Sequence, residues 1–358
     1  MRLLHLADRL TDRGGAYRHL LGVLEALAPG HEVVLAVGRD DGLVAAPCPT
    51  RVVPGLEART SSPVDLEGLA ADVRPDLVHA HNLVNPVALR WLAARPRAVL
   101  TVQDHRAFCP TRGKWTSAGR VCREPMAAET CAPCFEDPAY FREVYALTLE
   151  RLEAVRRLRV VVPSRYMAGE LAGAGVPAGR IHVVPPFVHG LLPDAPPEGP
   201  ASVLFAGRLA ETKGVSDAVE AWRRSGVDLP LVIAGTGPLR DALEREGLPV
   251  LGWIGRERLS RLYRAARAVL LPSRWQEPFG IVGLEALAMG VPVVAWESGG
   301  VGEWHPGGDG LVPWGDRDGL AAALRAEVGR PRAVLSAPPG FDRDTLMARL
   351  AGVYAERT

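Results

Sequence analysis

Two glutamates lie on either side of a turn whose backbone could hold a phosphate group. The segment from Trp275 to Ala286 reads WQEPFGIVGLEA and follows an apolar run at 267–271 that predicts a strand. Pro278 suits the first turn of a helix, and the apolar residues after it predict a helix to about Met289. The amides around Phe279 to Val282 would then form a helix N-terminus, which attracts anions.

A nucleotide sugar laid across this helix end would use both carboxylates. Glu277 at the mouth would accept hydrogen bonds from sugar hydroxyls, and Glu285, on the order of 10–12 Å farther along the axis, would accept them from the ribose diol. Two exposed glutamates at this spacing are common, so the pair alone does not establish a site. Its sequence context adds weight, because GVPVV follows at 290–294 and two glycines follow at 299–300.

Two cations occur in a second glycine-flanked segment. The run VLFAGRL at 203–209 brings Arg208, and Lys213 precedes Gly214. When a nucleoside diphosphate departs, negative charge collects on the leaving oxygen, and two fixed cations would stabilise it without a metal ion. Arg208 can bind two oxygens at once, whereas Lys213 acts as a compact point charge. The alternative is an exposed pair in an ordinary loop.

Together these segments resemble the donor site and the diphosphate clamp of the retaining GT-B glycosyltransferases of family 4, also called glycosyl transferases group 1. The resemblance implies a GT-B fold, transfer with retention at the anomeric carbon, and no catalytic metal. It also implies catalytic roles for Glu277, Arg208 and Lys213. The donor-binding residues that it implies are Gly14, Gly15, Arg208, Lys213, Trp253, Ile254, Glu277, Phe279, Gly280, Ile281, Val282 and Glu285.

The acceptor side departs from the family pattern. The family often has a histidine after the strand that corresponds to 98–102, where this chain has Gln103, with His105 two residues later. We expect His105 to be the catalytic histidine of the cleft and Gln103 to bind a sugar hydroxyl, with His81 a weaker candidate. Gly14 and Gly15 follow the first strand, where their small size would let a ligand approach the backbone, although an ordinary glycine turn explains them as well.

Four of the five cysteines gather in one loop-like insertion, residues 105–136. Cys109, Cys122, Cys131 and Cys134 have the spacing C-x12-C-x8-C-x2-C, which in a reducing compartment favours a structural zinc site. Free or redox-active thiols, an iron–sulfur cluster and disulfides are the alternatives. Because the insertion follows His105, we expect it to shape the acceptor pocket. Arg112 and Lys114 would then meet a polar or anionic acceptor.

Alternating strands and helices predict two doubly wound parallel-sheet domains, an α/β architecture. Residues 1–185 form the expected acceptor-side domain, 186–200 a proline-rich linker, and 201–340 the nucleotide-sugar domain; 341–358 is a helix that could return to the first domain. The expected strands are 3–7, 31–37, 51–54, 76–81, 98–102, 159–163, 180–184, 202–206, 230–234, 249–253, 267–271 and 291–295. Ligands of such sheets bind beyond the carboxyl ends of the strands.

The composition is that of a globular protein without a strong charge. The 358 residues include 47% hydrophobic and 23% charged residues, with a net charge of +1, so nucleic acid is not an expected partner. No apolar run is long enough to span a bilayer or to be a signal peptide, so we expect a cytoplasmic location and no integral membrane segment.

The residues therefore predict a glycosyltransferase of the hexosyltransferase class. It would take a UDP- or GDP-type sugar and a small-molecule, glycan or lipid-linked acceptor; the sequence does not indicate its oligomeric state. The alternatives are a nucleotide-sugar epimerase or hydrolase on the same fold, and a metal or redox protein centred on the cysteines.

Overall fold

The chain folds into two compact units in a computed structural model that describes residues 1–111, 113–331 and 338–356. Unit 1 comprises Met1–Pro186 and Arg343–Thr358, and unit 2 comprises Phe187–Asp342. Most of the proline-rich segment expected as a linker, from residue 187 onward, is therefore counted within unit 2. The two units are described separately below.

Unit 1 is built on a seven-stranded sheet in the order β3-β2-β1-β4-β5-β6-β7, and all its neighbouring strands are parallel. Its strands are β1 (Arg2–Leu10), β2 (Glu32–Asp40), β3 (Thr50–Val52), β4 (Leu77–His81), β5 (Ala98–Thr101), β6 (Arg159–Val162) and β7 (Ile181–Val183). Its longer helices are α1 (Gly15–Leu27), α2 (Leu66–Val73), α3 (Pro86–Ala93), α5 (Pro138–Val155), α6 (Arg165–Gly173) and α12 (Arg343–Ala355).

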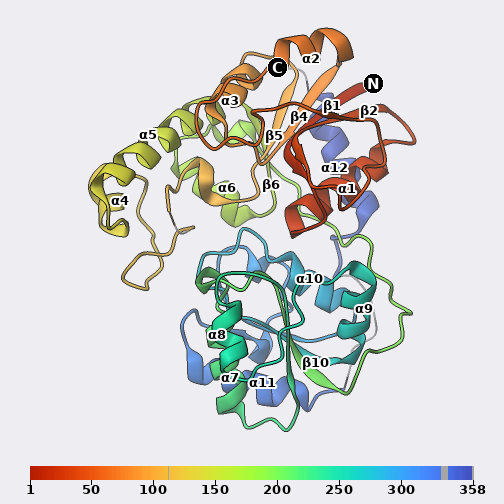
Figure 1. Cartoon of the computed structure of the whole chain (residues 1–358), viewed down its shortest axis with the longest axis vertical. Helices are drawn as coiled ribbons and strands as arrows, with labels where there is room; N and C mark the ends of the chain where they lie inside the picture. The colour runs from red at the N-terminus through yellow and green to blue at the C-terminus, as the bar shows by residue number, and fades with distance from the viewer. Residues whose placement is uncertain (112, 332–337, 357–358) are drawn as a thin grey trace. The chain divides into compact units, whose positions relative to one another are not determined.

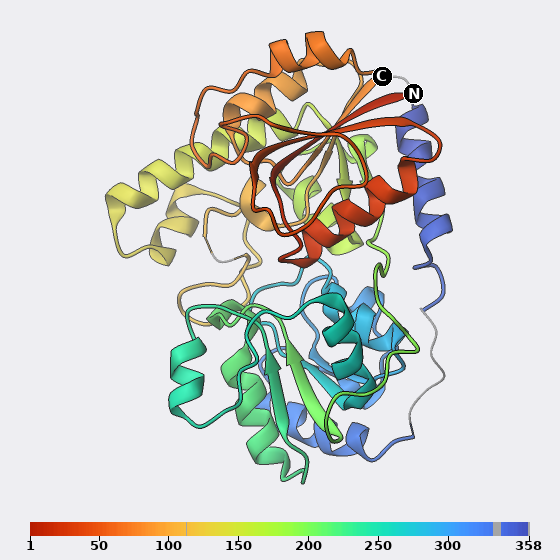
Figure 2. The same ribbon diagram turned by 45° about the vertical axis from the view of Figure 1, so that its right-hand side comes forward.

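Both faces of this sheet are buried, which explains why its strands read as nearly continuous apolar runs. Leu4, Leu6 and Ala80 point into a core that side chains from α2, α3, α5 and α6 complete. The helices begin at polar caps: the side chains of Asp65, Asn85, Asp137 and Ser164 accept backbone N–H groups of α2, α3, α5 and α6. In Figures 1 and 2 the C-terminal helix α12 lies beside α1.

A cluster of buried histidines occupies the sheet of unit 1. His5 on β1 pairs in register with His79 on β4, and His81 follows two residues later on the same face. His5 Nδ1 lies 2.9 Å from His81 Nε2. His79 bonds Tyr354 Oη of α12 at 2.6 Å and Thr101 Oγ1 at 2.7 Å. The histidines thus bind the C-terminal helix to the sheet of unit 1.

Unit 2 has a five-stranded parallel sheet in the order β12-β11-β10-β8-β9. Its strands are β8 (Ser202–Ala206), β9 (Leu231–Ala234), β10 (Ala266–Leu271), β11 (Val293–Trp296) and β12 (Leu311–Val312). Its helices are α7 (Val215–Ser225), α8 (Arg240–Arg245), α9 (Arg256–Ala265), α10 (Ile281–Ala288) and α11 (Arg317–Val328). Residues of α7, α8 and α11 form one core and residues of α9 and α10 the other, so the sheet is covered on both faces.

Two expected elements of unit 2 differ from the structure. The strand predicted at 249–253 does not form; Val250 makes a single bridge to Ile233. Pro249 has no N–H to donate, and Gly252 turns the chain at φ 71°. The helix expected from Pro278 begins instead at Ile281, after Gly280 at φ 84°. Pro278 and Phe279 therefore belong to the loop that precedes α10.

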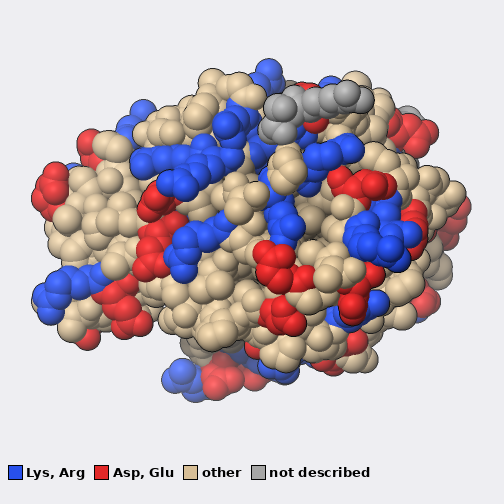
Figure 3. Space-filling model, turned by 90° about the horizontal axis from the view of Figure 1, so that it is seen from above, with Lys and Arg blue, Asp and Glu red and all other residues tan. Residues whose placement is uncertain are grey.

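In the described residues, no helix is long and apolar enough to cross a membrane. On the face drawn in Figure 3, basic and acidic side chains are both present.

The histidine cluster makes the stability of unit 1 sensitive to acid. Burial, and then the charge of His31, lowers the pKa of His5 from 6.5 to about 3. Burial and neighbouring histidines hold the pKa values of His79 and His81 well below 6.5. The unfolded chain binds protons at these residues below about pH 6.5 while the folded chain does not. Each histidine therefore costs stability as the pH falls from there toward its folded pKa.

We expect the free energy of unfolding of unit 1 to be insensitive to these groups above pH 7. It should fall below about pH 6.5 by up to about 1.4 kcal/mol per pH unit for each histidine. Urea titrations from pH 7.5 to 5 measure this slope. The variant His5→Gln should reduce the slope by up to one proton. An equal slope in the wild type and His5→Gln would contradict the prediction.

Candidate functional site

The candidate site of unit 2 lies where β8 and β10 end. Parallel strands bring their carboxyl ends to one edge of the sheet, and the loops that follow β8 and β10 meet there. The first loop carries Arg208 and a single-turn helix, η4 (Glu211–Lys213); the second runs from Pro272 to Gly280. These loops bring together residues about 64 positions apart in the chain.

An ion pair joins the two loops. Lys213 Nζ lies 2.6 Å from Glu277 Oε1, and Ser273 donates its hydroxyl to the same oxygen at 2.6 Å. The ammonium group also lies over the ring of Trp275, 4.0 Å from its centroid. Glu277 exposes 4% of its side chain, against 25% for Lys213. The carboxylate is thus held inside the protein, while its cation still reaches solvent.

The charge of Glu277 depends on this pairing. Burial raises the pKa of the carboxyl group, but the Lys213 charge and the hydrogen bonds from Lys213, Ser273 and Trp275 lower it by more, so the pKa lies below its usual value. Glu277 is therefore an anion at neutral pH and can only accept hydrogen bonds. Hydroxyl groups of a sugar would be suitable donors.

Two glycines that pack near the second loop have no room for a side chain. A Cβ on Gly299 would come within 2.2 Å of the Glu277 carbonyl oxygen, and Gly300 donates its N–H to that oxygen at 2.8 Å. A Cβ on Gly283 would meet the Trp304 ring at 1.9 Å. Trp304 in turn donates its indole N–H to the carbonyl of Phe279. The glycines after Glu277 thus allow the close packing that fixes this loop.

The helix α10 begins without a side-chain cap. Gly280 occupies the N-cap position, and the first turn contains no acidic residue. Ile281 and Val282 are partly exposed, so this N-terminus combines amides and a positive dipole end without a negative partner from its own first turn. Arg208 is also exposed, and in the described part of the chain its guanidinium has no ion-pair partner. Both features could receive an anion.

Glu285 lies one turn inside α10 and is buried. Its Oε1 lies 2.5 Å from Arg256 Nη1 of α9, and its Oε2 accepts from Tyr263 at 3.3 Å. The alternative that Glu285 is an exposed surface residue is thus excluded, and a ribose would have to share the carboxylate with these partners. Of the other expected donor-binding residues, Trp253 is partly exposed and Ile254 is packed in the core.

The motif Asp316-Arg317-Asp318, which resembles a metal-binding DxD, has another role in the structure. The Asp316 carboxylate accepts the N–H of Gly319 at 2.8 Å and caps α11. Asp318 pairs with Arg224 at 3.1 Å.

The acceptor-side residues of unit 1 are less exposed than expected. His105 is 3% exposed, with Nε2 3.0 Å from the Tyr166 hydroxyl. His81 belongs to the buried cluster described above. Gln103 is partly exposed at the carboxyl end of β5, and its N–H donates to Asn82 Oδ1 at 3.2 Å. His105 and His81 are thus bonded within unit 1, whereas Gln103 is partly exposed, and a role for each of them at an acceptor stays a prediction.

Two cations of the insertion were also expected at the acceptor. Lys114 is instead 6% exposed, and its ammonium donates to the Glu124 carbonyl at 2.7 Å and pairs with Glu170 of α6 at 3.1 Å. The lysine thus connects the insertion to α6, and the expectation of an acceptor contact is wrong for this structure. Arg112 lies outside the described residues.

A glycine turn also begins the first helix of unit 1. Gly14 adopts φ 126° and occupies the N-cap position of α1, which has no side-chain cap and no acidic residue in its first turn. Gly15 is the first residue of the helix. The conformation at position 14 favours glycine, and binding of a ligand at this turn stays a prediction.

The four cysteines of the insertion are free and partly buried. Cys131 and Cys134 lie at the ends of a short helix, α4 (Ala128–Cys131), and the turn that follows it. Burial, and then the nearby thiols of Cys109, Cys122 and Cys134, raise the pKa of Cys131. In the described ranges, three potential metal ligands lie within 4.8 Å of one another only at His5, His79 and His81. The cysteines within these ranges do not form such a group.

Two family models match the chain. Glycosyltransferase Family 4 matches residues 13–189 and Glycosyl transferases group 1 matches residues 200–327. Similar proteins include glycogen synthase of Mycobacterium tuberculosis, 32% identical over 293 residues that cover 73% of this chain and 62% of that enzyme. The chain thus spans less than two thirds of that relative. A GDP-mannose-dependent mannosyltransferase acting on phosphatidylinositol dimannoside, from the same species, is 37% identical over 36% of each chain.

Solved structures agree on the fold. Sucrose-phosphate synthase from Thermosynechococcus elongatus matches with a TM-score of 0.68 at 19% identity, covering 99% of this chain and 98% of the other. Anabaena HepE in complex with UDP matches with a TM-score of 0.64 at 18% identity, covering 98% and 99%. The two family models together match most of the chain, and the solved structures show that it has the GT-B fold.

Proposed function

We propose that the protein is a hexosyltransferase that moves a sugar from a UDP- or GDP-sugar to an acceptor hydroxyl, with retention of the anomeric configuration. The observation that carries the proposal is the buried Glu277 carboxylate paired with the partly exposed Lys213, beside the uncapped start of α10. A relative that uses GDP-mannose and a fold neighbour that binds UDP support a nucleotide-sugar donor.

In this mechanism the residues of unit 2 hold the two ends of the donor differently. The diphosphate meets Arg208, Lys213 and the amides at the start of α10, which draw off the negative charge of the leaving group. Glu277, which can only accept hydrogen bonds, orients the sugar hydroxyls, and Glu285 receives the ribose diol. The acceptor hydroxyl then attacks the anomeric carbon from the face that the diphosphate leaves. The bond from that carbon to the diphosphate oxygen breaks, and the hydroxyl proton passes to the departing diphosphate. Cations and amides supply the electrostatic stabilisation, so no step requires a divalent metal.

Unit 1 would bind the acceptor. Gln103 is the partly exposed residue at the end of β5 and could bind a hydroxyl but could not transfer a proton. The acceptor is a small molecule, a glycan or a lipid-linked molecule, and a cytoplasmic location stays a prediction.

The proposal predicts that one nucleotide sugar is turned over and that Lys213 is needed. A thermal-shift screen of UDP-, GDP-, ADP- and TDP-sugars identifies the donor, because a ligand stabilises the state that binds it. With that donor, Lys213→Ala should lower kcat/KM by about 100-fold or more, because it removes a preorganised charge at the leaving group.

The matched control is Arg223→Ala, which removes an exposed cation of the same unit that pairs with Glu246 and should retain turnover. Equal kcat/KM of Lys213→Ala and the wild type for the donor would exclude the proposed clamp. Conversion of the sugar nucleotide at full rate without an acceptor would favour an epimerase or hydrolase.

We also propose that Cys109, Cys122, Cys131 and Cys134 bind a structural zinc ion. Their thiols are near one another without being gathered to ligand distance, so binding would require the insertion to close around the metal. Purified protein should contain about one zinc ion per chain, and Cys131→Ser should lose it. Cys48→Ser, at the one cysteine outside the insertion, should keep the metal. Zinc-free wild-type protein with free thiols would contradict the proposal.

A further inference from the structure

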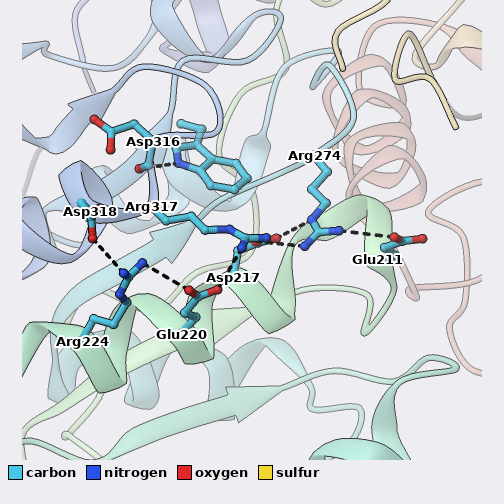
Figure 4. Close-up of polar contacts among 9 residues, drawn as sticks. Glu211, Asp217, Glu220, Arg224, Arg274, Asp316, Arg317 and Asp318 are labelled. Carbon is cyan, nitrogen blue, oxygen red and sulfur yellow. Dashed lines mark hydrogen bonds and ion pairs between the residues drawn. The ribbon is translucent and has the colours of Figure 1, made fainter. Parts of the chain in front are cut away.

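A network of charged side chains connects the loops of the candidate site to two helices of unit 2. Asp217 on α7 exposes 1% of its side chain and lies between two arginines, Arg274 and Arg317 (Figure 4). Arg274 belongs to the loop after β10, which also carries Glu277, and Arg317 belongs to the first turn of α11. Asp217 is thus a buried anion with partners from two different segments.

The pairing of Asp217 with Arg274 is the stronger of the two. Arg274 Nε lies 2.5 Å from Oδ2 and Arg274 Nη2 lies 3.0 Å from Oδ1, so the guanidinium grips both oxygens. Arg317 makes one contact, 3.0 Å from Oδ1, and is 47% exposed, against 22% for Arg274. Asp217 therefore holds the side chain of Arg274 in one geometry, and this restrains the position of the Arg274 backbone.

The backbone at Arg274 connects the two loops of the candidate site. The N–H groups of Arg274 and Trp275 both donate to the carbonyl of Thr212, at 3.0 and 3.1 Å. Thr212 precedes Lys213, and Ser273 on the other side of Arg274 bonds Glu277. The position of Arg274 thus sets where Lys213 and Glu277 meet.

The first loop lies close against the second. Gly214, which follows Lys213, adopts φ 67°, and a Cβ there would come within 1.7 Å of the Pro272 carbonyl oxygen. The indole of Trp314 donates to the carbonyl of Arg274 at 3.1 Å and closes the network from the side of α11. Backbone contacts on both sides of Arg274 therefore transmit any movement of its side chain to the ion pair.

We propose that Asp217 is a positioning residue for glycosyl transfer, which acts by holding Arg274 and thereby fixing Lys213 against Glu277. The inference rests on the function proposed above for these two residues. Asp217 itself touches neither donor nor acceptor in this account. Its effect is on the distance between the cation that meets the diphosphate and the carboxylate that meets the sugar.

The test compares carboxylate-to-amide changes at two residues of the same helix. Asp217→Asn keeps the shape of the side chain but removes the charge that holds Arg274. Glu220→Gln is the matched control, because Glu220 pairs with Arg317 and Arg224 but not with Arg274. Steady-state kinetics with the donor that the wild type uses, well below each melting temperature, should show kcat/KM for the donor about 100-fold lower in Asp217→Asn. Glu220→Gln should stay within about twofold of the wild type, since exposed ion pairs contribute little.

Further measurements separate positioning from general stability. The KM for the acceptor should be unchanged in Asp217→Asn, and Asp217→Glu, which keeps the charge, should recover most of the lost activity. If Asp217→Asn does not fold, Arg274→Lys replaces it, because lysine keeps the charge but loses the two-pronged grip. A folded Asp217→Asn or Arg274→Lys with wild-type kcat/KM would overturn the proposal, as would an equal loss in Glu220→Gln.

The wild type and Lys213→Ala, measured in parallel, distinguish this proposal from the function on which it rests. If Lys213→Ala loses turnover and Asp217→Asn keeps it, the positioning role is contradicted but the proposed function is not. A wild type that turns over no sugar nucleotide contradicts the proposed function and the positioning role with it.

Discussion

Glu277 carries a negative charge in a place that water hardly reaches, and the loops of unit 2 are arranged around this constraint. Removing a carboxylate from water is costly unless a cation and hydrogen bonds replace the solvent. Lys213 supplies the charge and Ser273 a hydrogen bond, each at 2.6 Å. Because Lys213 and Glu277 follow different strands, the pair can form only if β8 and β10 are neighbours in the sheet.

The same requirement explains several residues that take no part in chemistry. Gly214 and Gly299 allow backbones to approach where a side chain would collide with a carbonyl oxygen. Arg274, held by Asp217, and its neighbour Trp275 donate the N–H groups that fasten the second loop to the Thr212 carbonyl. A donor diphosphate would compete with Glu277 for Lys213, and the partly exposed ammonium is placed to serve both.

Much of the fold follows from the alternation of apolar runs and amphipathic segments, because a parallel sheet buried on both faces needs such a pattern. The strand expected at 249–253 failed because Pro249 and Gly252 interrupt the pairing, and β12 has only two residues, too few to give a periodic signal. The start of α10 was misplaced because Pro278 is a helix-start signal, whereas the chain turns at Gly280. The sequence shows no sign that Tyr354 would reach His79, since that contact joins residues 275 positions apart.

Lys213 and Glu277, both expected on the donor side, are in contact in the structure, whereas two residues expected on the acceptor side make internal contacts. Charged residues next to glycines after apolar strands indicate a ligand site wherever the strands lie in the sheet. Lys114 and His105 have the residue types that bind ligands, but the fold uses them for internal contacts with Glu170 and Tyr166. Asp217 was missed because its role depends on Arg274, which comes from another segment.

The central claim is that Lys213 meets the diphosphate of the donor, and calorimetric titration tests it most directly. The nucleoside diphosphate and the corresponding nucleoside are each titrated into the wild type and into Lys213→Ala. Loss of a charge-assisted contact should weaken binding of the diphosphate by about 10-fold or more while affinity for the nucleoside is unchanged. Equal affinity of both proteins for the diphosphate would contradict the account.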